Sequence, residues 1–138
     1  MTVYFEDLDI GRAAEFARTI TEADITLFAG ISGDHNPIHV NQEYAASTAF
    51  QGRIAHGILT ASLVSAVLGM QMPGTGTIYV SQSLKFRGPV RIGDTVTARV
   101  VVKEKDPQRK RVTFDTSCRV GEKVVLEGEA VVIAPSRG

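Results

Sequence analysis

The most restrictive feature of this sequence is one run of residues, IAHGILTASLVSAVLGM at 54–70, that contains no Asp, Glu, Lys or Arg. A helix through this run is apolar on nearly every side, so we expect it to be buried nearly all round. A membrane span is the alternative, but the run is shorter than the roughly 20 residues that a bilayer needs. It also contains polar side chains and lacks flanking aromatic belts. We therefore predict a buried helix and no membrane span.

Alternating patterns indicate a sheet around this helix. Apolar and polar residues alternate in several segments, which is typical of strands with one buried face. The strand candidates are residues 13–20, 77–86, 94–105, 110–120 and 123–134. Short turns separate the last three, which are expected to be antiparallel neighbours. A helix that is apolar all round needs a sheet that curves about it, so we predict an α+β fold of this kind. Its edge strands and one helix flank would stay uncovered, which favours a homodimer.

Two shorter helices are expected between the first strand and the long helix. In TEADITLFAGIS, Thr21 is a candidate N-cap, and Asp24 three residues later can complete a capping box. Gly33 follows as a stop signal. In NQEYAAST, Asn41 is the candidate N-cap.

The totals of the sequence limit the classes of protein it can be. Its 138 residues fit one domain, residues 1–138. Lys+Arg and Asp+Glu are both 15, so it lacks the basic excess of a general nucleic-acid binder. The single cysteine, Cys118, cannot form an intrachain disulfide and is expected to be a small structural strand residue. The N-terminus lacks a basic stretch followed by an apolar run, so we expect no signal peptide and a cytoplasmic location.

The segment SGDHNPIHVN at 32–41 concentrates ionisable side chains on one short loop. Gly, Asp, Asn and Pro form turns for backbone reasons alone, so a turn without function is one interpretation. Pro37 stiffens the segment, however, and Asp34 and His39 lie five residues apart on either side of it. Such a turn can direct both side chains into one cavity. There the pair would hold a water molecule and move its protons.

Two other kinds of site fit these residues less well. His35 and His39 have the i,i+4 spacing of a helical zinc site, but Pro37 disfavours a helix between them. A calcium loop that begins at Asp34 needs Glu at its twelfth position, where the chain has Ala45. A serine nucleophile of the GxSxG type has no matching motif. We therefore expect no metal, and acid–base chemistry on a water.

The start of the long helix, FQGRIAHGI, is the second part of the expected site. A helix N-terminus presents free backbone N–H groups and the positive end of the helix dipole. Gly57 has no side chain, so a carbonyl oxygen can approach its N–H, which would stabilise an oxyanion or enolate. The alternative is that Gly57 only permits close packing. His56 is expected to pack or form hydrogen bonds rather than to take part in catalysis.

Together these segments are similar to a known family. SGDHNPIHVNQEYAASTAF, RIAHGILTASLVSAVLG and PGTGTIYVSQSLKFRGPVRIGDTV resemble the MaoC-like hot-dog-fold hydratases. The similarity is greatest to the short, single-domain (R)-specific enoyl-CoA hydratases that supply polyhydroxyalkanoate synthesis. The combined D-x-N-P-x-H and A-H-G motifs carry the resemblance. It implies a hot-dog fold, a curved antiparallel sheet around a long central helix in dimers, which agrees with the patterns above.

The resemblance also implies roles for individual residues. The family's catalytic aspartate and histidine correspond to Asp34 and His39, and the asparagine that supports them corresponds to Asn36. The backbone amide of the oxyanion hole corresponds to Gly57. Two residues of the long helix are implied to line the acyl pocket, and plain core packing is the alternative for both. They are Ser65 and Leu68.

The implied reaction is hydration of a trans-2-enoyl-CoA to the (R)-3-hydroxyacyl-CoA, catalysed by a lyase of fatty acid metabolism. No cofactor is expected, because coenzyme A is part of the substrate and the thioester supplies the activation. The alternative is a dehydratase that acts on 3-hydroxyacyl thioesters of acyl carrier protein, or on branched or dicarboxylic CoA substrates. The expected partner is a second copy of the chain, with larger assemblies left open. Four basic residues either meet the phosphates of coenzyme A or are solvated charges: Arg53, Lys85, Arg87 and Arg91.

Overall fold

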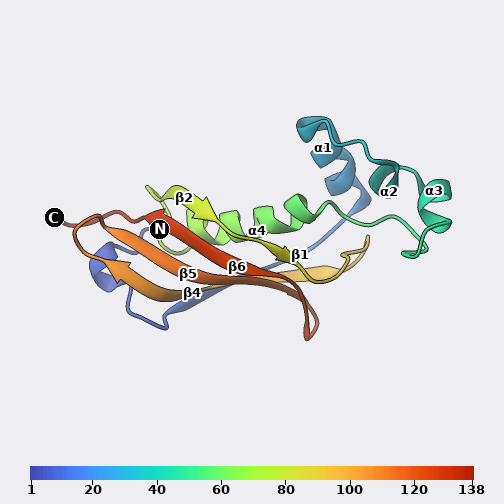
Figure 1. Cartoon of the computed structure of the whole chain (residues 1–138). Helices are drawn as coiled ribbons and strands as arrows, with labels where there is room; N and C mark the ends of the chain where they lie inside the picture. Colours follow the sequence, from blue (N-terminus) through green and yellow to red (C-terminus); the bar gives the residue numbers. More distant parts are fainter.

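The computed structural model describes all residues, 1–138 (Figure 1). The elements in chain order are η1 (Phe5–Asp7), β1 (Ala13–Thr19), α1 (Glu22–Ser32), α2 (Pro37–Val40), α3 (Gln42–Ala46), α4 (Gly57–Met70), β2 (Ile78–Gln82), β3 (Lys85–Phe86), β4 (Thr95–Asp106), β5 (Arg111–Val120) and β6 (Lys123–Ile133). No helix among them combines the length and the apolar character that crossing a membrane requires.

All strands belong to one antiparallel sheet. Its order is β1-β4-β5-β6-β2, and the short β3 also pairs with β6. The pairing of β4 with β5 and of β5 with β6 confirms the expected antiparallel neighbours. The strand expected at 77–86 is observed as two, β2 and β3, on either side of Ser83. At this point the backbone of Ser83 lies close to Gly128 of β6. Only glycine allows this contact, because a Cβ atom on residue 128 would lie 1.9 Å from the Ser83 carbonyl oxygen.

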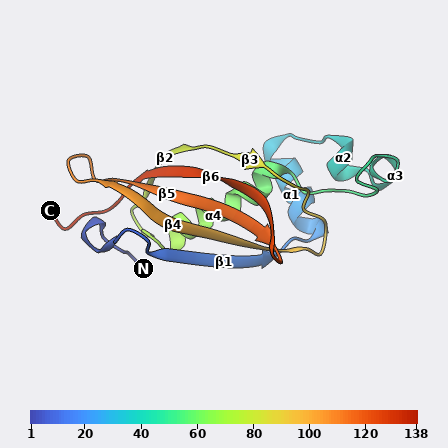
Figure 2. The ribbon, with the colours of Figure 1, turned by 60° about the horizontal axis from the view of Figure 1, so that its bottom comes forward.

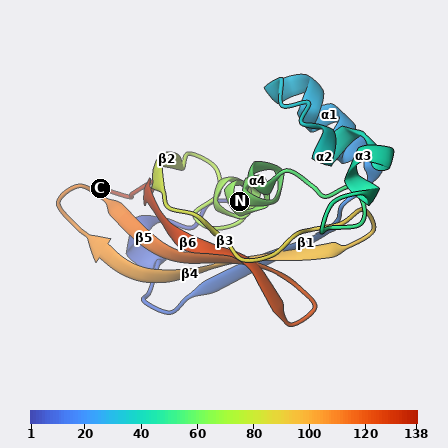
Figure 3. The ribbon, with the colours of Figure 1, turned by 45° about the vertical axis from the view of Figure 1, so that its right-hand side comes forward.

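The sheet curves around α4, and Figures 2 and 3 show the helix lying along its hollow face. The alternation expected for residues 94–105 is present in β4, where Val96, Val100 and Val102 are buried with alternate neighbours more exposed. They pack with Val64 and Leu68 of α4 in one cluster of 24 buried apolar residues. The expected fold, a curved antiparallel sheet around one long helix, is confirmed.

Helix α4 is buried on its sheet side and open on the opposite flank. It begins at Gly57 rather than at Ile54, because His56 occupies the N-cap position and Ile54 forms a bridge with Arg91. Ile58 lies on the open flank, where it is exposed. One chain therefore does not bury α4 nearly all round, in contrast to the prediction from the sequence. The helix flank that was expected to stay uncovered, and to favour a dimer, is present.

Residues 22–46, which we call the arm, project beyond one end of the sheet (Figures 1 and 3). The arm's first helix has the expected capping box, in which Thr21 Oγ1 accepts from the Asp24 N–H and Asp24 accepts from the Thr21 N–H. Gly33 ends this helix with φ of 79°, a left-handed conformation that suits glycine. The arm thus delivers the segment 34–39 to the N-terminal end of α4.

Candidate active site

Asp34 follows directly after α1 and lies in an ordered turn. Its N–H donates to Ser32 Oγ at 3.1 Å, and its Oδ1 accepts from the Asn36 N–H at 3.2 Å. The residue is exposed, so its carboxylate is accessible to water or a ligand. Local hydrogen bonds of this kind fix a carboxylate in place without removing it from solvent.

Asn36 and Pro37 start the short helix that carries His39. Asn36 is its N-cap, with Oδ1 accepting from the Ile38 N–H at 3.1 Å. As expected, no helix joins His35 to His39, but Pro37 starts a short helix of its own that the sequence analysis did not predict. Pro37 occupies the first helical turn, where its missing N–H costs nothing and its fixed φ suits the helix. Asn36 thus donates its N–H to Asp34 and caps the helix that carries His39.

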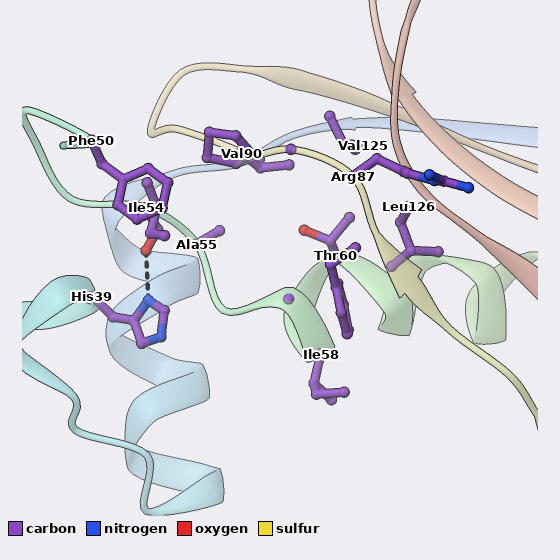
Figure 4. A pocket seen from close by; sticks show the side chains of 14 residues that line it. His39, Phe50, Ile54, Ala55, Ile58, Thr60, Arg87, Val90, Val125 and Leu126 are labelled. Atoms are coloured by element: carbon purple, nitrogen blue, oxygen red, sulfur yellow. Dashed lines mark hydrogen bonds between the residues drawn. The ribbon is translucent and has the colours of Figure 1, made fainter.

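His39 is buried, and its ring has a defined hydrogen bond. Nδ1 lies 2.8 Å from the carbonyl oxygen of Ile54. A carbonyl oxygen only accepts, so Nδ1 carries the proton and Nε2 is the nitrogen available to a ligand. Figure 4 shows the His39 ring at the edge of the pocket with this hydrogen bond drawn.

Arg53 holds the backbone of His39 rather than facing a ligand. Its Nε–H donates to the His39 carbonyl at 2.6 Å, and Nη1 lies 2.8 Å from Glu22 Oε1. The side chain of Arg53 is only 9% exposed, against 69% for Glu22. The structure supports neither of the two roles expected for Arg53, which were a contact with phosphate and a solvated surface charge.

His56 lies between the two halves of the site. It is 2% exposed, and its Nε2 lies 2.9 Å from the Asp34 carbonyl oxygen. Its ring stacks on that of His39, with centroids 3.9 Å apart and planes 27° apart. One ligand-type atom from each of Asp34, His39 and His56 lies within 4.8 Å of the others.

This cluster has the composition of a metal site but not a favourable geometry for one. A metal ion lies close to the plane of each imidazole that binds it, at about 2.0–2.1 Å from the nitrogen. Two stacked, nearly parallel rings such as His39 and His56 share no point at that distance in both planes.

Gly57 begins α4 beside His56. A Cβ atom at this position would lie 2.5 Å from Cε1 and 2.8 Å from Cδ1 of the Phe86 ring. Glycine is therefore required for the contact with Phe86, which supports the packing interpretation. The same residue lines the pocket, as the oxyanion interpretation needs. The two interpretations are compatible.

A cavity of about 560 Å³ adjoins these residues. It is lined mainly by apolar side chains from the start of α4, β3, β6 and the loops at 50–55 and 87–90, with His39 and Arg87 among the polar ones (Figure 4). Ser65 lies elsewhere, in a groove of about 290 Å³ between α4 and β2. Leu68 is buried in the core. Ile58 lines both the cavity and the groove, so the two spaces are neighbours.

Cys118 is buried behind α4, with its Sγ 3.7 Å from the Thr60 carbonyl oxygen. Burial raises the pKa of its thiol to about 12. A thiol that remains protonated is a poor nucleophile. This agrees with the structural role expected from its strand pattern.

A curved antiparallel sheet around one long helix, with an Asp/His pair at the N-terminal end of that helix, defines a hot-dog-fold protein of the hydratase type. The chain belongs to the MaoC-like family, because the model of the MaoC like domain matches residues 7–124.

Individual relatives agree with this assignment. The chain is 60% identical over 135 residues to an (R)-specific enoyl-CoA hydratase of Rhodospirillum rubrum, covering 98% of this chain and 94% of the relative. It is 50% identical to a 3-hydroxybutyryl-CoA dehydratase of Methylorubrum extorquens, covering 98% and 86%. Among solved structures, the unliganded R-hydratase PhaJ1 of Pseudomonas aeruginosa has a TM-score of 0.94 and 42% identity, covering 99% of this chain and 88% of that one.

Two residues of this site have contacts that the sequence did not predict. His56 packs and forms a hydrogen bond, as expected, and the structure adds that these contacts are with the His39 ring and the Asp34 backbone. Its place next to Gly57 in the A-H-G motif was the available signal. Arg53 gave no such signal, because its contact with the His39 carbonyl depends on how the arm folds back on the chain.

Proposed function

We propose that this protein is an (R)-specific enoyl-CoA hydratase, a hydro-lyase that converts trans-2-enoyl-CoA and water to (R)-3-hydroxyacyl-CoA. The observation that supports this most is the meeting of the Asp34 and His39 side chains within 4.8 Å, beside a cavity that Gly57 lines. The names of the two relatives describe the same reaction in its two directions, hydration and dehydration.

In the proposed mechanism, Asp34 and His39 hold the attacking water. Asp34 accepts a proton from the water, and His39 orients it through Nε2, the nitrogen left free by the bond to Ile54. The water oxygen bonds to C3 of the substrate as electrons move to the thioester oxygen. The Gly57 N–H donates to that oxygen and stabilises the enolate. As the enolate collapses, the Asp/His pair returns a proton to C2.

The proposed reaction uses only water and the thioester, so we expect no additional cofactor. Arg87 lines the cavity and pairs with Glu127 at 2.5 Å, in an exposed position where the phosphates of coenzyme A can compete for it. An acyl chain that extends past Ile58 would reach the groove that contains Ser65. Pocket roles for Ser65 and Leu68 remain predictions, as do a single domain over 1–138 and a cytoplasmic location.

We also propose that the functional form is at least a homodimer. Ile58 on the open flank of α4 and Ile78 and Tyr79 on the edge strand β2 are exposed large apolar or aromatic residues. A second copy that covers this flank would bury them and close the groove between α4 and β2. Light scattering after size exclusion should give at least twice the monomer mass of 14.9 kDa.

The test of the function is hydration of crotonyl-CoA by the purified protein. Loss of the conjugated-thioester absorbance gives the rate, and an (R)-specific dehydrogenase added afterwards gives the handedness of the product. We expect fast turnover to the (R)-alcohol, abolished in Asp34→Ala and His39→Ala. Turnover of crotonyl-acyl carrier protein with none of crotonyl-CoA would instead favour the carrier-protein dehydratase. An (S)-product would contradict the proposal.

A further inference from the structure

His56 is the third histidine of the chain, and the mechanism above does not use it. Its side chain is buried against the Asp/His pair, with one edge toward Asp34 and one face on His39. Phe28 of α1 lies on it as well, with ring centroids 4.8 Å apart. His56 is also the N-cap residue of α4, directly before Gly57. One side chain therefore contacts residues from the arm and belongs to the start of α4.

The hydrogen bond of His56 fixes which of its nitrogens carries the proton. Because the Asp34 carbonyl only accepts, Nε2 of His56 must be the donor across the 2.9 Å contact. In the neutral ring Nδ1 is then an unprotonated acceptor. It is buried and has no hydrogen-bond partner, and it is the one buried side-chain nitrogen or oxygen of the chain in this condition.

An unpaired buried nitrogen is unfavourable, so packing alone does not explain a histidine here. An aromatic hydrocarbon ring would pack against His39 and Phe28 without that cost. A phenyl ring, however, lacks the donor that holds the Asp34 carbonyl. The histidine combines a flat ring for the stack with an N–H for the loop.

We propose that His56 is a positioning residue for the hydration reaction. Its N–H fixes the backbone of Asp34, and its ring fixes the plane of the His39 imidazole. Because His56 precedes Gly57 in the chain, it also links the Asp34 backbone and the His39 ring to the Gly57 N–H, which faces the thioester in the proposed mechanism. This inference rests on the proposed function, because it assigns His56 to the same site. Displacement of a reacting group by about 1 Å can cost about 10²-fold in rate.

Two substitutions separate the two contacts. His56→Gln keeps an N–H at the position of Nε2 but removes the ring, whereas His56→Phe keeps a ring and removes the donor. The matched control is His35→Gln, since His35 is exposed, lies next to Asp34, and forms no side-chain hydrogen bond in the structure. Each variant is assayed with crotonyl-CoA for kcat and KM, after circular dichroism has shown that it folds.

We expect kcat of His56→Phe to fall between about 10- and 100-fold with KM within about threefold of wild type. His56→Gln should recover part of this loss, and His35→Gln should match the wild type. A parallel change of kcat and KM, or wild-type kcat in both His56 variants, would overturn the proposal. Wild-type protein that does not hydrate crotonyl-CoA would instead refute the proposed function.

Nitrogen NMR gives a readout that does not depend on activity. The chain has three histidines, so the ring signals can be assigned by subtraction with His35→Gln and His56→Gln. In wild-type protein we expect His56 protonated on Nε2 and His39 protonated on Nδ1. A His56 ring that is protonated on Nδ1, or that exchanges between tautomers, would contradict the proposed contact with Asp34.

Discussion

Replacing Gly57 by alanine separates the packing role of this residue from its proposed catalytic role. The added methyl group would lie 2.5 Å from the Phe86 ring, well inside van der Waals contact. Overpacking of this kind costs about 1–3 kcal/mol. Because the Phe86 side chain is 54% exposed, its ring can move outward. We therefore expect a loss of about 1 kcal/mol in the free energy of unfolding, measured by urea titration.

The catalytic cost of the same change should be larger. If the thioester oxygen docks against the Gly57 N–H, a methyl group beside that N–H displaces it. Loss of one such donor lowers kcat by about 10²–10³-fold. The assay is crotonyl-CoA hydration under conditions where the variant is fully folded.

A double-mutant cycle with Phe86→Ala distinguishes the two effects. In the Phe86→Ala background the methyl group meets no ring, so the stability cost of Gly57→Ala should fall to within about 0.5 kcal/mol of zero. The activity cost should persist, with each rate compared with the Phe86→Ala single variant. Recovery of activity together with stability would refute the oxyanion role and leave Gly57 a packing residue.

Three further predictions concern groups around the site and at the chain ends. Burial raises the pKa of the Cys118 thiol to about 12, so iodoacetamide at pH 8 should label it only after denaturation, as measured by mass spectrometry. Rapid labelling of the native protein would contradict this. The pKa of the Glu6 carboxyl is lowered from 4.5 to about 2, mainly by the hydrogen bond from the Arg137 backbone N–H. The stability that this carboxylate contributes to the fold is therefore complete above pH 4.5 and is lost as the pH falls through about 2. Glu6→Gln should flatten the dependence of unfolding free energy on pH in that window, and an unchanged slope would refute the assignment. Arg53→Met removes the charged donor to the His39 carbonyl. It should lower the free energy of unfolding by about 1.5–3 kcal/mol in urea titration and also lower kcat. A wild-type unfolding free energy together with a wild-type kcat would show that the contact is unimportant.

The elements that the sequence predicted well are those determined by local patterns. Thr21 and Asp24 are three residues apart, so their capping box could be recognised without any tertiary information. The alternation in β4 specified which of its faces is buried. The uncharged run at 54–70 indicated a helix that needs a curved sheet, and this constraint led to the correct architecture.

The elements that were missed depend on context. Pro37 prevents one helix from including both His35 and His39, as expected, but the short helix that it starts after the Asn36 cap was not predicted. Ser65 lies in a groove between α4 and β2 that adjoins the cavity, and its role in the acyl pocket stays a prediction. The stack of His56 on His39 joins residues 17 positions apart through the return of the arm, which no local pattern encodes.

The most direct test of the account is the rate of crotonyl-CoA hydration by Asp34→Asn. Asparagine keeps an oxygen that can accept from the Asn36 N–H, so the turn should be preserved while the carboxylate base is lost. We expect a folded protein whose kcat is about 10²–10⁴-fold below that of the wild type. A kcat within a few-fold of wild type would contradict the assignment of Asp34 as the base that activates the water.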